Sequence, residues 1–307
     1  MLRAFIESHK AGSPTDDKVY WVVLKPCALA RLFYKKYQIT VSNGVVKRLL
    51  KHLGYGYRKH SKQLTTGNYP RRNEQFEIIC SLVLIMSLES PVISIDCKKK
   101  ERLGNLYRDG RCHCTKAIKV YDHDYEHLAE DKVIPHGIYD LQANKGYISI
   151  GNSSETADFV VDNLLWWWQE HGIHLYPKAR NILLLCDAGG ANSYRHHIFK
   201  QKLMVFARKT GLSVIVCHYP PYCSKWNPIE HRLFSQVHKA MEGAVFTDYA
   251  TVQRIMQQTS TITGLTVVVR LNLKNYEKGV KADKTQLNEK RISYHLNIPQ
   301  LNYRIYP

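Results

Sequence analysis

The sequence lacks a segment that is long and apolar enough to cross a lipid bilayer. Its most apolar run, residues 78–88, is far shorter than the ~20 residues that a transmembrane helix needs. The N-terminus also lacks the pattern of a secretory signal peptide. These absences argue against a membrane protein and against a secreted one, so a reducing, intracellular setting is the default expectation.

Paired cysteine motifs are missing as well. The eight cysteines are scattered along the chain, and several fall in apolar runs, where a free thiol behaves as a small hydrophobe. The one close group is Cys112-His113-Cys114, and no CxxC pair accompanies it. Ligands this close together do not have the spacing of a structural zinc site. The sequence therefore predicts free cysteines and no zinc centre.

Acidic residues are scarce relative to basic ones. Lys and Arg number 44 against 26 Asp and Glu, which gives a formal net charge of +18. A surplus of this size is typical of proteins that bind nucleic acid. The alternative is a basic, soluble protein without a polyanionic partner. The length of 307 residues allows one large domain with a real core and a smaller domain beside it.

Internal repeats and low-complexity tracts are also absent, and a helical N-terminal part precedes an α/β part. Periodic apolar residues predict a helix over 26–37. A second helix is predicted to begin after a capping Ser42 and to stop at Gly54. Two short helices joined by a tight turn resemble a helix-turn-helix.

The second of these helices carries a polar and basic side. Its residues are Asn43, Lys47, Arg48 and Lys51. Contact with DNA through this side is one interpretation, and an ordinary helical hairpin with a solvated basic side is the other. A polar linker over residues 61–72 and a further helix over 73–88 are predicted to follow.

From residue 91 onward the pattern changes to strands alternating with helices. A strand, two hairpin strands, a helix, a strand, a helix, a strand and a helix are predicted, in this order, over 92–96, 137–141, 146–150, 154–171, 182–187, 192–210, 212–218 and 228–241. Residues 98–136 are polar and are predicted to form an irregular excursion. This order is the ribonuclease-H-like plan, in which the first and fourth strands are neighbours and a late helix crosses their carboxyl ends.

Three acidic residues lie where this plan brings them together. Asp96 ends the first strand, Asp187 ends the fourth, and Glu230 lies in the first turn of the last helix. Carboxylate oxygens suit Mg²⁺, and two such ions roughly 3.5–4 Å apart serve the attacking and leaving oxygens of a phosphate displacement. The sequence therefore predicts a divalent-metal site for chemistry on a phosphate polymer.

Glu230 also has a purely structural interpretation. Asn227, Pro228 and Glu230 occupy the N-cap, N1 and N3 positions of the last helix, which is a capping-box arrangement. Taken alone, this spacing favours a cap. Together with Asp96 and Asp187, it favours the metal site.

Basic and aromatic residues flank the three acids. Lys98, Lys99 and Lys100 follow Asp96 directly, and Lys225 and Trp226 come shortly before Glu230. The lysines suit phosphates and the tryptophan suits a nucleic-acid base. A solvated strand end and a rigid hinge ahead of the helix are the corresponding structural interpretations.

Four segments resemble the DDE transposases of the insertion-sequence group ISAzo13, also called Rhodopirellula-type. They are PVISIDCKKKE (91–101), IPHGIYDL (134–141), LLCDAGGANS (184–193) and CHYPPYCSKWNPIEHRLFS (217–235). The resemblance covers roughly residues 40–285, and the last motif is long and specific. The chain departs from the family pattern at Cys97, where a small or hydroxyl residue is usual, and at Tyr222, where glycine is usual.

The resemblance implies a DDE transposase that cleaves DNA strands and transfers them at insertion-sequence ends with Mg²⁺ or Mn²⁺. Its catalytic, metal-binding carboxylates map onto Asp96, Asp187 and Glu230. The implied partners are the DNA of the element ends and the target, and further copies of the chain in a homo-oligomer. The implied location is the cytoplasm, with nucleoid association on binding DNA. The alternatives are a ribonuclease-H-like nuclease that does not join strands and a truncated, non-catalytic DNA-binding copy.

The expected fold is thus an α/β, ribonuclease-H-like catalytic domain that follows a small helix-turn-helix-like domain. The expected boundaries are 1–62 for the DNA-binding segment, 63–90 for the linker and connecting helix, 91–270 for the catalytic domain and 271–307 for a C-terminal tail.

Overall fold

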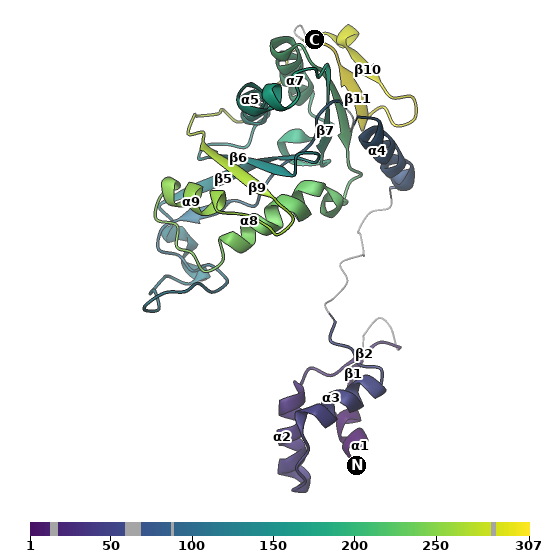
Figure 1. Cartoon of the computed structure of the whole chain (residues 1–307), viewed down its shortest axis with the longest axis vertical. Helices are drawn as coiled ribbons and strands as arrows, with labels where there is room; N and C mark the ends of the chain where they lie inside the picture. Colours follow the sequence, from purple (N-terminus) through teal and green to yellow (C-terminus); the bar gives the residue numbers. More distant parts are fainter. Residues whose placement is uncertain (13–17, 59–68, 87–88, 284–286) are drawn as a thin grey trace. The chain divides into compact units, whose positions relative to one another are not determined.

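The computed structural model describes residues 1–12, 18–58, 69–86, 89–283 and 287–307. The chain divides into two compact units, Met1–Leu64 and Thr65–Pro307 (Figure 1). Most of the predicted polar linker lies outside the described residues. No helix in the described ranges is long and apolar enough to span a membrane.

The smaller unit is helical. It consists of α1 (Leu2–Glu7), α2 (Pro26–Tyr37), α3 (Asn43–His52) and the short strands β1 (Ala11–Gly12) and β2 (Tyr20–Trp21). The predicted spans of α2 and α3 are confirmed. Pro26 occupies the first turn of α2, where its fixed φ suits the helix. The Ser42 hydroxyl accepts a hydrogen bond from the Val45 amide (3.3 Å) and caps α3.

The larger unit is built on one mixed sheet of nine strands. The strands are β3 (Val92–Cys97), β4 (Glu101–Leu103), β5 (Asp131–Asp140), β6 (Lys145–Gly151), β7 (Asn181–Cys186), β8 (Ser213–His218), β9 (Thr266–Leu271), β10 (Ile292–Tyr294) and β11 (Asn302–Ile305). Their order is β10-β11-β8-β7-β3-β5-β6-β9, with β4 beside β5. The predicted neighbours β3 and β7 pair in parallel, with Ile95 opposite Cys186.

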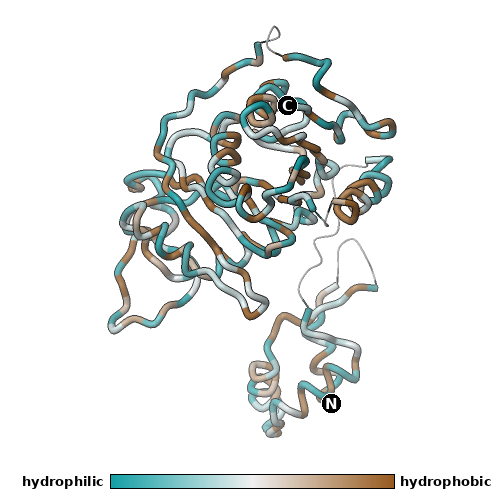
Figure 2. Tube along the Cα trace, turned by 45° about the horizontal axis from the view of Figure 1, so that its top comes forward, coloured by the Kyte–Doolittle hydropathy of each residue, from teal (hydrophilic) through white to brown (hydrophobic). Residues whose placement is uncertain are grey.

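Helices cover both faces of this sheet (Figure 1). They are α4 (Arg72–Met86), α5 (Ala157–Trp167), α6 (Ile173–Leu175), α7 (His197–Thr210), α8 (Ser235–Ala240) and α9 (Tyr249–Gln257). The pleat of β7 explains the two covered faces, because successive side chains point to opposite sides. Leu184 packs with α5 and α7, whereas Leu183 packs with α4. Figure 2 shows hydrophobic residues along the strands and helices of this unit and hydrophilic residues on the segments that loop out.

Two tryptophans at the end of α5 and just after it belong to the core. Trp167 is fully buried and Trp168 is 6% exposed, and both belong to the hydrophobic cluster that includes Phe199 of α7. Burial leaves neither ring free to stack on a nucleic-acid base.

Three sequence predictions about this unit are wrong at their limits. The excursion 98–136 is partly ordered, since β4 pairs with β5 and β5 already begins at Asp131. The start of β5 was missed because its apolar residues Val133 and Ile134 directly follow two charged residues. The predicted helix 192–210 begins only at His197, after a separate turn over Gly190–Asn192. The predicted helix 154–171 begins at Ala157, capped by Thr156.

The C-terminal residues also differ from the expected tail. They form β10 and β11, and β11 pairs antiparallel with β8. Tyr303 and Ile305 alternate inward and are buried in the core that α5 and α7 cover. Four-residue and three-residue strands are too short to show a convincing period in the sequence, so the prediction missed them.

Candidate active site

The site lies at the carboxyl ends of β3 and β7. The parallel register that pairs Ile95 with Cys186 places the next residues, Asp96 and Asp187, side by side at one sheet edge. The Asp96 carboxylate accepts a hydrogen bond from the Cys97 amide (2.8 Å). Sheet pairing and this local bond hold the backbone of both acids in place before any ligand binds.

Glu230 comes from the segment that follows β8 in the chain. It begins a π-helical turn, η5 (Glu230–Phe234), that leads into α8. Such turns often occur at functional sites. Glu230 lies close enough to Asp96 and Asp187 for its charge, in addition to burial, to raise the pKa of both aspartates. The structure therefore brings together all three predicted acids.

A buried hydrogen-bond chain holds η5 against β3. The Ser94 hydroxyl donates to the side-chain oxygen of Asn227 and accepts from the Ile229 amide (3.2 Å). The Asn227 amide donates to the Ser224 carbonyl (2.8 Å). The capping box that rivalled the metal site is therefore not formed, because the Glu230 amide donates to the Asn227 backbone carbonyl (3.1 Å) and the Asn227 amide donates to Ser224 instead of to the Glu230 side chain.

Two glycines allow the helix to approach the sheet. A Cβ on Gly137, which is paired with Asp96, would lie 2.5 Å from Phe234 and 2.9 Å from Ile229. A Cβ on Gly146 would lie 2.3 Å from Leu233. These residues sit on η5 or next to it, so the missing side chains set the depth of Glu230.

We expect Gly137→Ala to destabilise the protein by about 1–3 kcal/mol, as overpacking of a filled core does, and to lower activity by displacing Glu230. Chemical denaturation and a DNA-cleavage assay measure the two effects. Adding Phe234→Leu removes the atoms nearest to the new methyl group and should restore part of both. A Gly137→Ala protein with full stability and activity would show that this close approach is unimportant.

The acids are buried and repel one another. Burial, followed by the charge of Asp187, raises the pKa of Asp96 to about 8. Burial, with the charges of Glu155 and Glu230, raises the pKa of Asp187 to about 6. One oxygen of Asp187, Oδ1, is buried without a hydrogen-bond partner. A divalent cation would offset the repulsion between the acids, because it supplies positive charge, and would give this oxygen a partner, because it prefers carboxylate oxygen.

The residue types at this site suit a divalent cation, but their side chains are not yet spaced as a complete set of ligands. In the ranges that the structure describes, no group of three or more His, Cys, Asp or Glu side chains is already spaced as a metal cluster. The carboxylates would therefore have to close on the ion when it binds. Their residue types, their mutual repulsion and the unpartnered Oδ1 of Asp187 all fit such an ion.

We expect the contribution of Asp96 and Asp187 to the stability of the cation-free protein to fall as the pH rises from about 4 to about 8. An unfolded Asp ionises near 3.8, whereas Asp96 and Asp187 keep their protons to about 8 and about 6. At these two groups the folded state thus binds more protons than the unfolded state across this window, so their contribution falls with pH. Melting temperatures in EDTA test this, with Asp96→Asn as the comparison. A melting-temperature difference between parent and Asp96→Asn that stays constant with pH would contradict the expectation.

The lysines after Asp96 do not share one environment. Lys98 is 8% exposed, and its ammonium pairs with Glu101 (2.5 Å), which also binds Arg108 (3.0 Å). The expectation that Lys98 faces phosphate is therefore corrected, because its charge is already paired inside the protein. Lys99 and Lys100 are exposed.

The loop before Glu230 presents an aromatic ring. Trp226 is 52% exposed and meets Phe76 of α4 edge-on, with ring centroids 6.1 Å apart. The Lys225 ammonium lies 5.5 Å from the Trp226 ring. Tyr222 adopts a left-handed φ of 64°, a conformation that glycine takes without strain.

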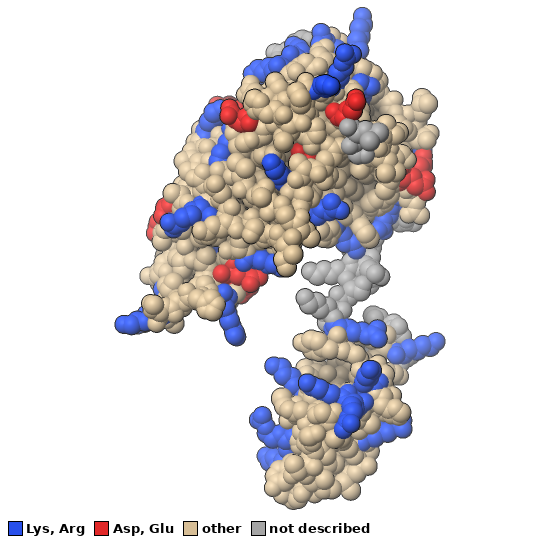
Figure 3. All heavy atoms as spheres, in the orientation of Figure 1, with Lys and Arg blue, Asp and Glu red and all other residues tan. Residues whose placement is uncertain are grey.

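In the smaller unit, the predicted DNA-binding residues lie on one exposed helix. Asn43, Lys47, Arg48 and Lys51 are all exposed on α3. Val46 points into the core between the helices. Figure 3 shows Lys and Arg gathered over the visible face of this unit.

Sequence reasoning missed two polar residues beside the acids. His218 ends β8, and its Nδ1 donates to the Asp187 carbonyl (3.0 Å). Burial lowers the pKa of His218 to about 4, so it stays neutral and holds that backbone in place. Its position inside the 217–235 motif was a usable signal. In addition to burial, the charge of Glu155 raises the pKa of Asp187 and of Cys97. Nothing in the sequence marks Glu155 as part of the site, since acidic residues commonly precede helices.

Comparison with known proteins gives one family. The family model described as the Rhodopirellula transposase DDE domain matches residues 1–307, the whole chain. The match thus extends beyond the range 40–285 that the motifs covered. No curated protein sequence gives a significant match.

Solved structures of the Mos1 transposase are similar to this chain at a low level. A Mos1 paired-end complex with the left transposon end is 16% identical, with 78% of this chain and 72% of that chain covered and a TM-score of 0.46. A mariner Mos1 paired-end complex with Mg is 15% identical, with 80% and 74% covered and a TM-score of 0.47. The Mos1 catalytic domain is 14% identical, with 64% and 82% covered and a TM-score of 0.41.

Proposed function

Because the chain belongs to the Rhodopirellula-type DDE transposase family, and is therefore a polynucleotidyl transferase that acts on DNA, we propose that Asp96, Asp187 and Glu230 are its catalytic carboxylates. The observation that carries this proposal is the meeting of the three acids from β3, β7 and η5 at one sheet edge. The family membership gives the reaction class, and the meeting of the three acids supports the choice of residues.

In this proposal the protein's own groups hold the site in position. Asp96 and Asp187 would bind the cations from the sheet, and Glu230 would bind from η5. Bound Mg²⁺ or Mn²⁺ ions would supply Lewis-acid stabilisation of both oxygens in an in-line displacement at phosphorus. Ser94 holds the start of η5 through Asn227 and Ile229, and His218 holds the Asp187 backbone.

One set of carboxylates is enough for two reactions. Strand cleavage uses water as nucleophile, and strand transfer uses a DNA 3′-hydroxyl. Both are displacements at a phosphodiester, so they need the same arrangement of acids around the phosphorus. This is why we propose cleavage and transfer at element ends as a single activity of one site.

The DNA would be held by exposed basic and aromatic residues. Lys99, Lys100 and Lys225 suit the backbone phosphates and Trp226 suits a base. The exposed side of α3 would contact DNA through the smaller unit. We also propose that several copies act together, since two element ends have to be processed; a DNA-dependent rise in molar mass by light scattering tests this.

A labelled oligonucleotide that carries an element end tests the reaction. In the presence of Mg²⁺ or Mn²⁺, we expect the protein to cut it and to join the product to a second duplex. Cutting without joining would favour a ribonuclease-H-like nuclease. Binding with neither reaction would favour a non-catalytic DNA-binding copy.

A further inference from the structure

A fourth acidic side chain, Glu155, approaches the site from the side of the sheet opposite to Glu230. Side chains alternate along β3: Ser94 and Asp96 point to η5, whereas Ile95 and Cys97 point to the face that α5 covers. Glu155 lies close enough to the Cys97 thiol for its charge, in addition to burial, to raise the pKa of that thiol. The two glutamates therefore flank the aspartate pair from opposite faces.

The turn after β7 lies beside both Glu155 and Asp187. A Cβ on Gly189 would lie 3.6 Å from Oδ2 of Asp187, and one on Gly190 would lie 3.1 Å from Oε1 of Glu155. Two adjacent glycines thus place the backbone of this turn close to both carboxylates. The charge of Glu155 also acts directly on Asp187.

Two cavities meet at this turn. One, of about 630 Å³, is lined by Glu155 and Gly190 and has Lys100, Lys132 and Lys278 in its wall. The other, of about 550 Å³, is lined by Asp187 and shares Gly190 and His196 with the first. Glu155 and Asp187 therefore line two neighbouring cavities that meet at Gly190 and His196.

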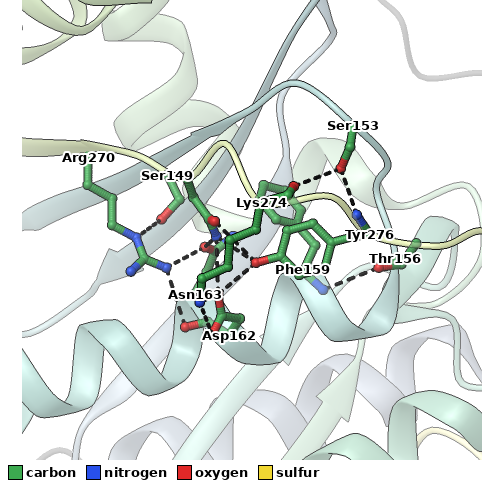
Figure 4. A network of polar contacts seen from close by, with 10 residues as sticks. Ser149, Ser153, Thr156, Phe159, Asp162, Asn163, Arg270, Lys274 and Tyr276 are labelled. Carbon is green, nitrogen blue, oxygen red and sulfur yellow. Dashed lines mark hydrogen bonds and ion pairs between the residues drawn. The ribbon is translucent and has the colours of Figure 1, made fainter.

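The segment that carries Glu155 is held rigidly (Figure 4). The Ser153 hydroxyl donates to the Lys274 carbonyl (3.1 Å) and accepts from the Tyr276 amide (3.1 Å). On the other side of Glu155, Thr156 caps α5 by accepting from the Phe159 amide (3.2 Å). A ligand-binding residue needs such support to keep its geometry.

We propose that Glu155 is a fourth carboxylate of the cation site, which strengthens binding of the divalent ion that Asp187 holds. This rests on the proposed function, since it assumes that Asp187 binds a cation. The competing role for Glu155 is to lie beside the Cys97 thiol and nothing more.

Titration of the metal-free, full-length protein with Mn²⁺, followed by calorimetry without DNA, separates these roles. Glu155→Gln keeps the shape of the side chain beside Cys97 but removes the charge, and should weaken Mn²⁺ binding by about 10-fold or more, as loss of an outer partner of a metal ligand does. The matched control is Asp158→Asn, in the first turn of the helix that follows Glu155, where the lost charge is paired with Lys202; it should bind Mn²⁺ like the parent. Asp187→Asn should lose binding.

Melting temperatures in EDTA supply the second readout. Glu155→Gln should raise the melting temperature, because it removes a like charge beside Asp187. Parent-like Mn²⁺ affinity for Glu155→Gln, with Asp187→Asn deficient, would overturn this inference and leave the three-acid site intact. Equal losses for Glu155→Gln and Asp158→Asn would overturn it as a general charge effect. Parent-like affinity for Asp187→Asn would overturn both proposals.

Discussion

Asp187→Asn is expected to abolish DNA cleavage and strand joining together while DNA binding survives. The substitution keeps the shape of the side chain but removes one negative charge from the site. A hard cation needs anionic oxygen to offset its lost water, so the loss should reach at least about 10²–10³-fold, the range seen when one electrostatic stabilising group is removed. The labelled-oligonucleotide assay measures cutting and joining, and a gel-shift assay measures binding.

The matched control for this result is Asp158→Asn, which removes the same charge from a residue outside the three-acid cluster. It should cut and join like the parent. If Asp187→Asn cuts as well as the parent, the metal-site proposal fails. If it loses one reaction and keeps the other, the single-site explanation of both reactions fails.

Replacing Lys47, Arg48 and Lys51 with Ala is expected to weaken DNA binding and to flatten its dependence on salt. Each lost phosphate contact lowers the slope of log Kobs against log salt by about 0.9, so three contacts lower it by about 2.7. Gel-shift or anisotropy titrations between low and physiological salt give the slope.

The smaller unit offers a control with the same charge loss. Arg31, Lys35 and Lys36 are exposed on the neighbouring helix α2, and replacing them with Ala should change the slope much less. Equal slopes for the α3 variant and the parent would leave α3 as a scaffold. Equal losses of slope for the two triple variants would show that α3 contributes only its general positive charge to DNA binding.

The central part of the larger unit could be predicted from the sequence because its signals are local. Apolar runs marked β3 and β7, and each ended in an aspartate. The order of elements then gave the parallel pairing that the structure has. Strand bounds were predicted less well where charged residues interrupted the apolar pattern, as in β5, or where strands were as short as β10 and β11.

The side-chain partners could not be predicted because they come from distant parts of the chain. Local spacing allowed Glu230 to be either a helix cap or a metal ligand. The interaction that the sequence could not reveal is the hydrogen bond from Ser94 to the side chain of Asn227, which is 133 positions away in the sequence. Lys98 is the opposite case, since its partner Glu101 is only three residues away, and that spacing was a signal that the sequence interpretation passed over.

Glu155 shows the limit of motif reasoning most clearly. Nothing in its immediate sequence distinguishes it from an ordinary residue ahead of a capped helix. Its nearness to Asp187 depends on the Gly189–Gly190 turn, and on the pleat that turns Cys97 away from Asp96. Both are properties of the folded sheet.

The most direct test of the three-acid site is a crystal of the protein soaked with Mn²⁺ and measured for anomalous scattering. The site described here predicts strong anomalous peaks bounded by the carboxylates of Asp96, Asp187 and Glu230, and their absence in an Asp187→Asn crystal. Mn²⁺ bound elsewhere, or bound with Glu230 directed away from both aspartates, would contradict it.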